Sequence, residues 1–406
     1  MDDNVCCDCI QDHALKARIS ARGAPEVCVL CGLTTNPAIS IQDLAGLMYP
    51  IIEEHFIQAG NAIDGEPLGD DLSWVVQEIL GQYLECEDAL LQALEEADPA
   101  DPRDGSEPFV SRDATYENSP TDLSAHFKTW ERIKGELKYR RRFFSDRARA
   151  FFGALFEELD QLRCPPGRRR AGGASAPISV VWTVPVGTAL FRARASDSTG
   201  ALRAILSRPA RELAAPPPQK ARAGRMNPEG ISVFYGALES ETCIAELRPS
   251  LGRMVVVGKF ATAAPLRVLD FRRLDKAYRG EKEASYFQRG ASRLFQRRAF
   301  LRALHKLVAE PVHPDGESDY LITQYLAEYL AHVRSPGVQG IIFASAQRTK
   351  GTNVVVFPNG GGGRPFPLSF VADSSRVFKT QSIRYKTSPI EVWFDEGALK
   401  MRSADE

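Results

Sequence analysis

The sequence predicts an α+β protein, in which an N-terminal cysteine knuckle and a helical bundle precede a mixed α/β domain. Five of the eight cysteines lie within the first 31 residues. Apolar residues then recur with helical spacing from about residue 38 to residue 163, and short β-branched runs alternate with helical segments after residue 177. Because single hydrophobic cores stop growing near ~250–300 residues, a chain of 406 residues is expected to form several domains.

Composition and charge narrow the class of protein. Hydrophobic residues make up 44% of the chain and charged residues 25%, which is typical of globular proteins. A formal net charge of -1 provides no overall field to attract nucleic acid or anionic lipid. No run approaches the ~20 apolar residues of a membrane helix, and the first residues are acidic where a signal peptide is basic. We therefore expect a cytoplasmic protein without a membrane or nucleic-acid partner.

The N-terminal cysteines have the spacing of a metal knuckle. Two C-x2-C pairs are separated by eighteen residues, a pattern in which two tight turns present four thiolates to Zn²⁺. Four thiolates leave no coordination position for substrate, so the metal is expected to be structural. An alternative set contains Cys7 or His13 in place of one cysteine. The four expected ligands of this module, residues 1–37, are Cys6, Cys9, Cys28 and Cys31.

The region 38–163 is expected to form three or four packed helices. Its apolar residues follow a 3.6-residue period in three runs, at residues 41–56, 71–97 and 122–163. Asp71 is the expected N-cap of the second run, and Thr121 or Asp122 that of the third.

The segment 164–177, CPPGRRRAGGASAP, has the composition of a linker, and it marks the main domain boundary. The domain that follows, residues 178–370, combines strands and helices, and residues 371–406 add C-terminal strands and a tail. Its expected strands are 178–184, 188–194, 232–237, 254–260, 266–270, 340–345 and 353–357. Its expected helices are 242–249, 284–310 and 319–334.

Four sequence blocks in this domain carry a family resemblance. They are LFRARAS at 190–196, GRMNPEGISVFYGALESETCIAELRP at 224–249, DYLITQYLAE at 319–328 and GIIFASAQRTKGTNVVVF at 340–357. In this order they resemble the RES family, whose members are similar to ADP-ribosyltransferases in fold and act on NAD. The resemblance covers about residues 185–360. The preceding helical region resembles the HEPN-related domain that accompanies some RES proteins.

The resemblance implies a set of catalytic residues. The family's arginines fall on Arg192 and Arg225, its tyrosine on Tyr235, its glutamate on Glu246 and its serine on Ser345. Arginine binds phosphate oxygens bidentately, and a carboxylate near the ribose stabilises an oxocarbenium-like transition state. The tyrosine ring offers a face on which nicotinamide can stack, and the serine hydroxyl can bind the attacking phosphate or the substrate diphosphate.

Further polar residues in the matching blocks are expected either to bind substrate or to satisfy backbone groups at strand ends. These are Asn227, Tyr320, Thr323, Gln324 and Asn353. The Pro- and Arg-rich segment between Arg194 and Arg225 is a departure from compact family members, and it either reshapes the pocket entrance or stays mobile.

The activity implied by the resemblance is breakage of the nicotinamide–ribose bond, with transfer of ADP-ribose to inorganic phosphate or water, as in an NAD phosphorylase or glycohydrolase. NAD would be a substrate, because no G-x-G-x-x-G motif follows a strand. Such a protein serves as a toxin or defence effector restrained by a cognate antitoxin protein. Two alternatives are an ADP-ribosyltransferase that modifies a macromolecule, and a non-catalytic zinc and helical binding module with a ligand-sensing RES domain. The oligomeric state is left open.

Overall fold

A computed structural model describes residues 3–60, 68–100, 105–164, 178–277, 285–309, 320–359, 366–383, 390–395 and 398–403. The chain forms two compact units. Unit 1 comprises residues 1–180 and 273–307, and unit 2 comprises residues 181–272 and 308–406. Most of the expected linker, residues 165–177, lies outside the described residues.

Unit 1 begins with a small antiparallel sheet in the order β1-β3-β2. Cys6 ends β1 and Cys9 ends η1, whereas Cys28 and Cys31 lie in the connection between β2 and β3. The bounds of the elements in this part are β1 Asn4–Cys6, η1 Cys7–Cys9, α1 His13–Arg22, β2 Ala24–Pro25 and β3 Pro37–Ser40. Helix α1 begins where Asp12 accepts hydrogen bonds from the backbone N–H groups of Ala14 and Leu15, which would otherwise lack partners.

The next part of unit 1 is helical, as predicted, but the three apolar runs form five helices among the described residues. These are α2 Ile41–His55, α3 Leu72–Leu80, α4 Glu87–Glu96, α5 Ser124–Tyr139 and α6 Asp146–Leu155. The second run divides at Gly81, whose φ of 69° ends α3 in the left-handed region that suits glycine. The third run divides after Tyr139.

The expected cap at Asp71 is present, whereas the N-cap of α5 is Leu123 and not Thr121 or Asp122, because the helix begins one residue later than expected. Asp71 caps α3 by accepting a hydrogen bond of 2.7 Å from the backbone N–H of Trp74. Asp122 accepts one of 2.8 Å from the N–H of Ser124, the first residue of α5. A two-stranded pair, β4 Phe56–Gln58 with β5 Tyr116–Asn118, connects the two halves of this helical region.

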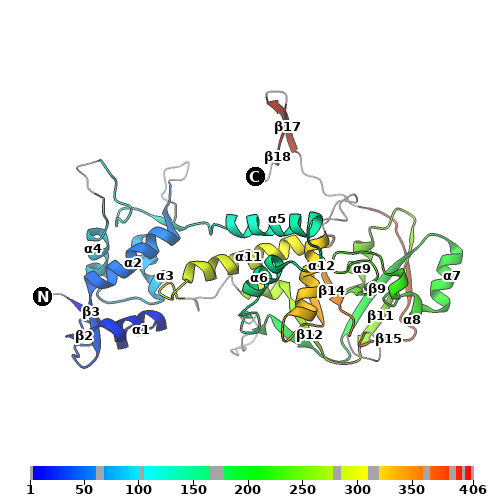
Figure 1. The fold of residues 1–406 in the computed structure, drawn as a ribbon, viewed down its shortest axis with the longest axis horizontal. Helices are drawn as coiled ribbons and strands as arrows, with labels where there is room; N and C mark the ends of the chain where they lie inside the picture. Colours follow the sequence, from blue (N-terminus) through cyan, green and yellow to red (C-terminus); the bar gives the residue numbers. More distant parts are fainter. Residues whose placement is uncertain are drawn as a thin grey trace. The chain divides into compact units, whose positions relative to one another are not determined.

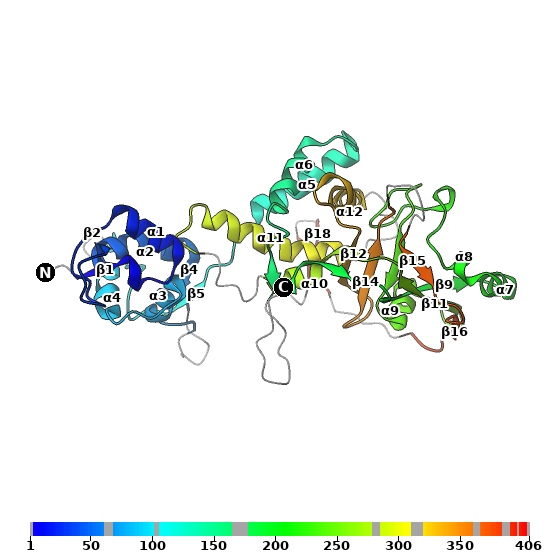
Figure 2. The same cartoon turned by 90° about the horizontal axis from the view of Figure 1, so that it is seen from below.

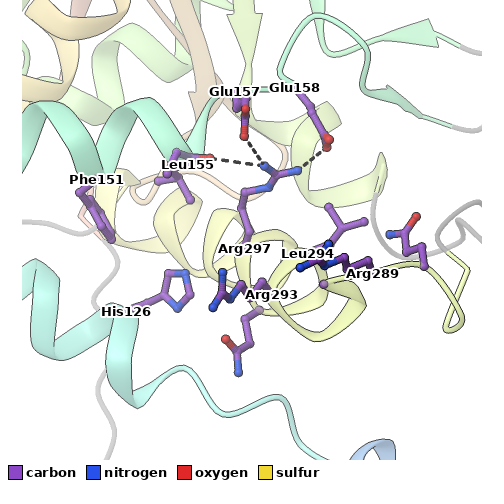
Figure 3. Close-up of a pocket in the computed structure, with 13 residues that line it drawn as sticks. His126, Phe151, Leu155, Glu157, Glu158, Arg289, Arg293, Leu294 and Arg297 are labelled. Carbon is purple, nitrogen blue, oxygen red and sulfur yellow. Dashed lines mark hydrogen bonds and ion pairs between the residues drawn. The ribbon is translucent and has the colours of Figure 1, made fainter. Parts of the chain in front are cut away.

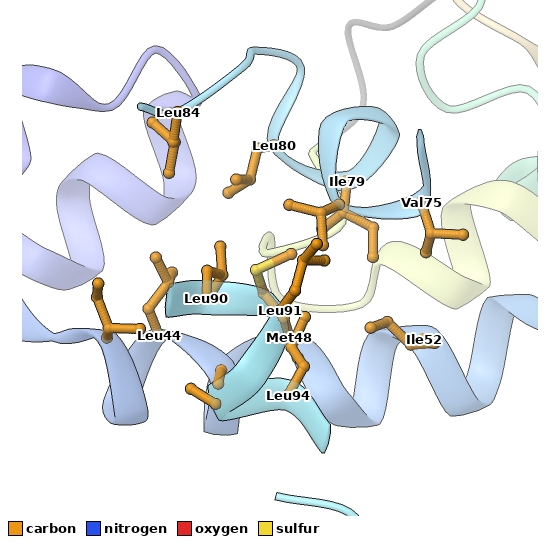
Figure 4. Packing of buried hydrophobic residues seen from close by; sticks show 14 of the residues in the cluster. Leu44, Met48, Ile52, Val75, Ile79, Leu80, Leu84, Leu90, Leu91 and Leu94 are labelled. Atoms are coloured by element: carbon orange, nitrogen blue, oxygen red, sulfur yellow. The ribbon is translucent and has the colours of Figure 1, made fainter. Parts of the chain in front are cut away.

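The core of unit 1 lies between α2, α3 and α4 (Figure 4). Apolar residues three or four positions apart on each helix point into one cluster, because that spacing places them on a single helix face. The cluster includes Leu44, Met48, Ile52, Val75, Ile79, Leu90 and Leu94.

Residues 273–307 also belong to unit 1. They contain part of α10, Phe271–Ala277, and most of α11, Ala291–Ala309. The α11 segment adds Phe300 to an aromatic group on α5 and α6, where it contacts Trp130 and Phe151. The sequence had placed this helix in the C-terminal domain. Periodicity identifies a helix but does not reveal which core its apolar face joins.

Unit 2 is built on a curled mixed sheet, a half-barrel, of nine strands among the described residues. The strand order is β15-β11-β9-β10-β14-β13-β12-β8, with β16 also paired to β11. Only β12 and β13 run parallel within it. The strands are β8 Val181–Val184, β9 Ala189–Ser196, β10 Phe234–Ala237, β11 Met254–Thr262, β12 Leu266–Asp270, β13 Gly340–Ala344, β14 Thr352–Val356, β15 Leu368–Phe370 and β16 Arg376–Lys379.

The helices of unit 2 lie in the connections of this sheet (Figures 1 and 2). They are α7 Thr199–Ser207, α8 Pro209–Glu212, η2 Pro218–Lys220, α9 Ser240–Leu247, α12 Leu321–Glu328 and the π-helical turn η4 Tyr329–Val333. Helix α9 packs against β9, β10, β11 and β14. None of the helices in the described residues is both long and apolar enough to cross a bilayer.

Near the C-terminus, β17 Ile390–Asp395 and β18 Ala398–Ser403 form a separate antiparallel hairpin. Residues 371–406 were expected to supply strands, and β16, β17 and β18 are those strands. Residues 401–403, in the expected tail, pair with β17, and residues 404–406 lie outside the described residues. Two-residue alternation of apolar side chains favours a strand here as elsewhere.

Shortening a core side chain of unit 1 tests this packing. Leu94→Ala is expected to lower the free energy of unfolding by about 2–5 kcal/mol, because Leu94 is fully buried and its loss leaves a cavity. Gln92→Ala on the exposed face of the same helix is the control, with an expected change within about 0.5 kcal/mol. Urea unfolding followed by circular dichroism measures both. Equal stability of the two variants would contradict the described core.

Candidate functional site

A cavity of about 310 Å³ lies in unit 2 among β9, β10, β14 and α9. The sheet register explains why distant residues meet there: Ala237 on β10 pairs with Phe191 on β9 and with Asn353 on β14. The cavity is lined by Arg192, Ala193, Arg225, Tyr235, Gly236, Cys243, Glu246, Leu247, Phe343, Asn353, Val354 and Val355. Four of the five predicted catalytic residues are among them. The fifth, Ser345, contacts the cavity through Glu246.

Glu246 is held by residues from two other elements. It follows Thr242 by four positions and Cys243 by three, so it lies on the face of α9 that these buried residues turn toward the sheet. Its Oε1 accepts hydrogen bonds from Ser345 Oγ at 2.6 Å and from Asn353 Nδ2 at 2.7 Å. No hydrogen bond to Oε2 is present among the described residues. One carboxylate oxygen is therefore fixed, and the other is left for a ligand.

All hydrogen-bonding positions of the Ser345 hydroxyl are occupied by groups of the protein. Ser345 follows β13 and donates its hydroxyl proton to Glu246, while the oxygen accepts from the backbone N–H groups of Gln347 and Arg348 at 3.1 Å each. A hydroxyl has one donor and two acceptor positions, and these three bonds occupy all of them. The arrangement orients the carboxylate of Glu246.

Arg192 is a partly buried cation on the central strand β9. Its Nη1 donates to the backbone oxygen of Tyr235 at 3.3 Å, and its guanidinium lies over the ring of Phe234, 5.2 Å from the centroid. Burial lowers the pKa of Arg192 to about 10, so the side chain still carries its charge at neutral pH. A cation with a single neutral acceptor and an aromatic face retains donors for an anionic ligand.

Arg225 lies on the loop that precedes β10. Its Nη1 donates to the backbone oxygen of Val308 at 2.6 Å, and burial lowers its pKa below the ordinary arginine value. The backbone oxygen of Arg225 accepts from Thr323 Oγ1 at 2.7 Å. Hydrogen bonds therefore hold both the guanidinium and the backbone of Arg225.

The loop around Arg225 is stabilised by polar side chains that the sequence had suggested for substrate binding. Asn227 is 3% exposed, and its Nδ2 donates to the backbone oxygens of Arg222, Pro228 and Ile231. Gln324 donates to the backbone oxygens of Gly224 and Asn227. These contacts correspond to the alternative role of satisfying backbone groups.

The remaining members of that set are Tyr320, Thr323 and Asn353. Tyr320 supplies a backbone oxygen to Thr323, and neither residue lines the cavity. Asn353 does line it and holds Glu246.

Tyr235 places its ring in the cavity but uses its hydroxyl elsewhere. The phenol donates to Asn227 Oδ1 at 2.8 Å and accepts from the backbone N–H of Met226 at 2.9 Å. Burial raises its pKa to about 12, so it remains a neutral donor. The ring is therefore the part available to a ligand.

A second cavity of about 450 Å³ shares Arg192 and Ala193 with the first. Its basic residues were not among the predicted site residues. They are Arg194, Arg211, Lys220 and Arg222. Arg194 lies on β9, and the other three come from the Pro- and Arg-rich segment, whose α8 and η2 line the cavity. The basic composition of this segment is visible in the sequence, but sequence alone does not show that Arg211, Lys220 and Arg222 face one cavity.

Cys243 was also missed. Its Sγ lies on the cavity wall and donates to the backbone oxygen of Phe191 at 2.9 Å, and burial raises its pKa to about 12. A single cysteine within the helical run TCIAELRP carries no spacing signal. The thiol is a neutral group that joins α9 to β9.

In unit 1, the four knuckle cysteines meet as their spacing predicts. Their sulfur atoms all lie within 4.8 Å of one another, and the Sγ–Sγ distances are 3.6 Å for Cys6–Cys9, 3.7 Å for Cys6–Cys31 and 3.8 Å for Cys28–Cys9. Tetrahedral Zn²⁺ with Zn–S bonds of ~2.3 Å places its sulfurs ~3.8 Å apart. Cys7 instead packs in the core of unit 1. The four thiols can hold a structural metal ion such as zinc.

Comparison with known protein families identifies residues 189–371 as a RES domain, a family of NAD-degrading toxins. The domain contains every residue that lines the two cavities of unit 2. It confirms the family resemblance of the four sequence blocks. Neither the curated proteins nor the solved structures contain a match to this chain.

Gly224 provides a test of the loop geometry. A Cβ at this position would lie 2.8 Å from both Tyr235 Oη and Asn227 Oδ1, closer than such atoms approach. Gly224→Ala is expected to lower the free energy of unfolding by about 1–3 kcal/mol, because the loop must shift and the Tyr235–Asn227 hydrogen bond weakens. Thermal and urea unfolding measure the change.

Gly200→Ala is the matched control, since its Cβ would meet only Ser198 Oγ, at 3.8 Å, within helix α7. Alanine favours helices more than glycine, so this variant should be as stable as the wild type or slightly more stable. An unchanged Gly224→Ala protein would show that the loop accepts a side chain and is not fixed as described.

Proposed function

We propose that this protein cleaves the nicotinamide–ribose bond of NAD and transfers the ADP-ribosyl group to inorganic phosphate or water. The observation that carries the proposal is the carboxylate of Glu246, clamped through one oxygen at a cavity that also contains Arg192, Arg225 and the ring of Tyr235. The RES domain match makes NAD the expected substrate.

The reaction requires stabilisation of positive charge on the ribose. As the glycosidic bond breaks, nicotinamide leaves with the electron pair and becomes neutral, and the ribose carbon acquires oxocarbenium character. Glu246 offers a carboxylate whose Oε2 accepts no hydrogen bond within the described part of the chain. A fixed negative charge beside the developing cation lowers the barrier without reorganisation cost. Phosphate or water then forms the new bond to the same carbon, and water loses its proton to solvent or to a base.

The two arginines suit the diphosphate of the substrate. Both remain close to the cavity through single contacts with backbone oxygens, 3.3 Å for Arg192 and 2.6 Å for Arg225, and a guanidinium has further donors. Their partial burial strengthens the attraction for a polyanion, because fewer water molecules screen it. The second cavity, with Arg211, Lys220 and Arg222, extends the positive surface from Arg192 and suits the remaining phosphate or an attacking phosphate, whereas Arg194 is paired with Glu212.

Ser345 and Asn353 are positioning residues in this proposal. They act through Glu246, since both donate to Oε1 and the Ser345 hydroxyl has no capacity left. This role differs from direct phosphate binding by Ser345, which the family resemblance had suggested.

The function is tested with Glu246→Gln. Loss of the negative charge should lower the rate of nicotinamide release about 10²–10³-fold, with the fold retained, because the amide preserves the size of the side chain. Purified protein is incubated with NAD with and without phosphate, and the products are followed by phosphorus NMR. Glu241→Gln, on the exposed side of the same helix, is the control and should retain the wild-type rate.

Wild-type turnover by Glu246→Gln would remove Glu246 from the mechanism. If the wild-type chain produces neither ADP-ribose 1″-phosphate nor ADP-ribose, NAD cleavage itself is wrong. A product that appears only with phosphate identifies phosphate as the acceptor.

The knuckle of unit 1 is part of the same proposal, with Zn²⁺ as its resident metal. The Sγ–Sγ distances match a tetrahedral tetrathiolate site, and such a site stabilises a module too small for a core of its own. All four donors are protein thiols, so the metal contributes stability and no chemistry.

Metal removal gives a direct test. Cys28→Ser should lose one equivalent of zinc by elemental analysis and lower the melting temperature of unit 1, while the rate of NAD cleavage by the folded protein is unchanged. Cys7→Ala is the control: it should retain the zinc, because Cys7 lies in the hydrophobic core. Loss of zinc from Cys7→Ala would favour the alternative ligand set.

A further inference from the structure

Unit 1 contains a larger cavity, of about 790 Å³, that has no part in NAD cleavage. It lies among α5, α6 and the N-terminal half of α11, and Figure 3 shows the side chains that line it. None of these residues lines either cavity of unit 2. Its size falls within the ~300–1,000 Å³ of small-molecule sites.

Three arginines line this cavity: Arg289 lies in the turn before α11, and Arg293 and Arg297 lie on one face of α11. Arg297 is neutralised, since its guanidinium pairs with Glu158 and lies 3.4 Å from Glu157 (Figure 3). Neither Arg289 nor Arg293 has an acceptor among the described residues. Arg289 and Arg293 carry like charges that repel, and the N-terminal end of α11, which begins between them, adds further positive potential. An anion bound beside these arginines would reduce their mutual repulsion and interact favourably with the positive end of the helix.

A neutral polar group lies beside these cations. The Nδ1 atom of His126 is buried and has no hydrogen-bond partner in the described part of the chain. Its ring stacks on Phe300, with centroids 5.2 Å apart, and burial lowers its pKa, which keeps the imidazole neutral near pH 7. A neutral imidazole provides one donor and one acceptor, so it suits a hydroxyl or a ring nitrogen.

The remaining wall is apolar. Phe151, Ala154 and Leu155 from α6 and Leu294 from α11 line it. An aromatic ring bounded by aliphatic side chains is a surface on which a planar base can stack. Cationic, polar and apolar surfaces are therefore combined in one cavity.

We propose that this cavity binds a nucleoside di- or triphosphate, with its phosphates at Arg289 and Arg293, its base against Phe151 and a sugar or base atom at His126. The site goes beyond the NAD cleavage proposed above and does not depend on it. A single-stranded nucleic acid is the weaker fit, because such strands need an extended basic groove with repeated stacking surfaces.

The test is calorimetric titration of the full-length protein with ATP. Arg289→Gln/Arg293→Gln should weaken ATP binding by at least ~10-fold, and its melting temperature in the absence of ligand should not fall, since neither side chain has a protein partner to lose. Arg132→Gln on the exposed face of α5 is the matched control and should bind ATP like the wild type. Arg225→Ala, altered in the NAD cavity, should also retain ATP binding, which separates this site from the proposed NAD site.

Tripolyphosphate and a short RNA serve as competing probes. ATP should bind at least ~10-fold more tightly than tripolyphosphate if the base contributes. The proposal is overturned if ATP does not bind at ~1 mM, if the double arginine variant binds it unchanged, or if tripolyphosphate binds equally well. It is also overturned if RNA binds and ATP does not displace it.

Discussion

The carboxylate clamp at Glu246 is the contact on which the candidate site depends. It joins α9 to the end of β13 and to β14, through residues 99 and 107 positions away in sequence. Both hydrogen bonds converge on one oxygen of a charged group, and charge-assisted bonds of this kind are stronger than neutral ones. The clamp therefore fixes α9 over the sheet and at the same time orients the group that the proposed chemistry requires.

The cations of the site have no ion-pair partner within the described residues. Arg192 and Arg225 are partly buried, yet each donates to only one backbone oxygen, and neither forms an ion pair within the described residues. Desolvation without a carboxylate partner lowers their pKa values. In the proposed function, binding of an anionic substrate offsets the free-energy cost of this desolvation. The supporting network of Asn227, Thr323 and Gln324 holds the loop of Arg225, so the arginine itself can remain available.

Unit 1 contains its own stabilising features and its own cavity. The cysteine knuckle and the core of α2, α3 and α4 provide stability, and α5, α6 and α11 surround a cavity with two uncompensated arginines. Helix α11 contributes to that cavity near its beginning, and near its end it carries Val308, the acceptor of Arg225.

The sequence by itself determined the local features. The cysteine spacing, the cap at Asp71, the β-branched runs that became β8 to β14 and the RES blocks each follow from patterns within a few residues, because period, caps and tight turns are local. The tertiary structure alone decided that the Ser345 hydroxyl is used up by Glu246, that Asn227 and Gln324 support a loop, and that basic residues between Arg194 and Arg225 line a second cavity. It also assigned residues 273–307 to unit 1. These outcomes depend on strand register and on contacts between residues about a hundred positions apart, which no local pattern encodes.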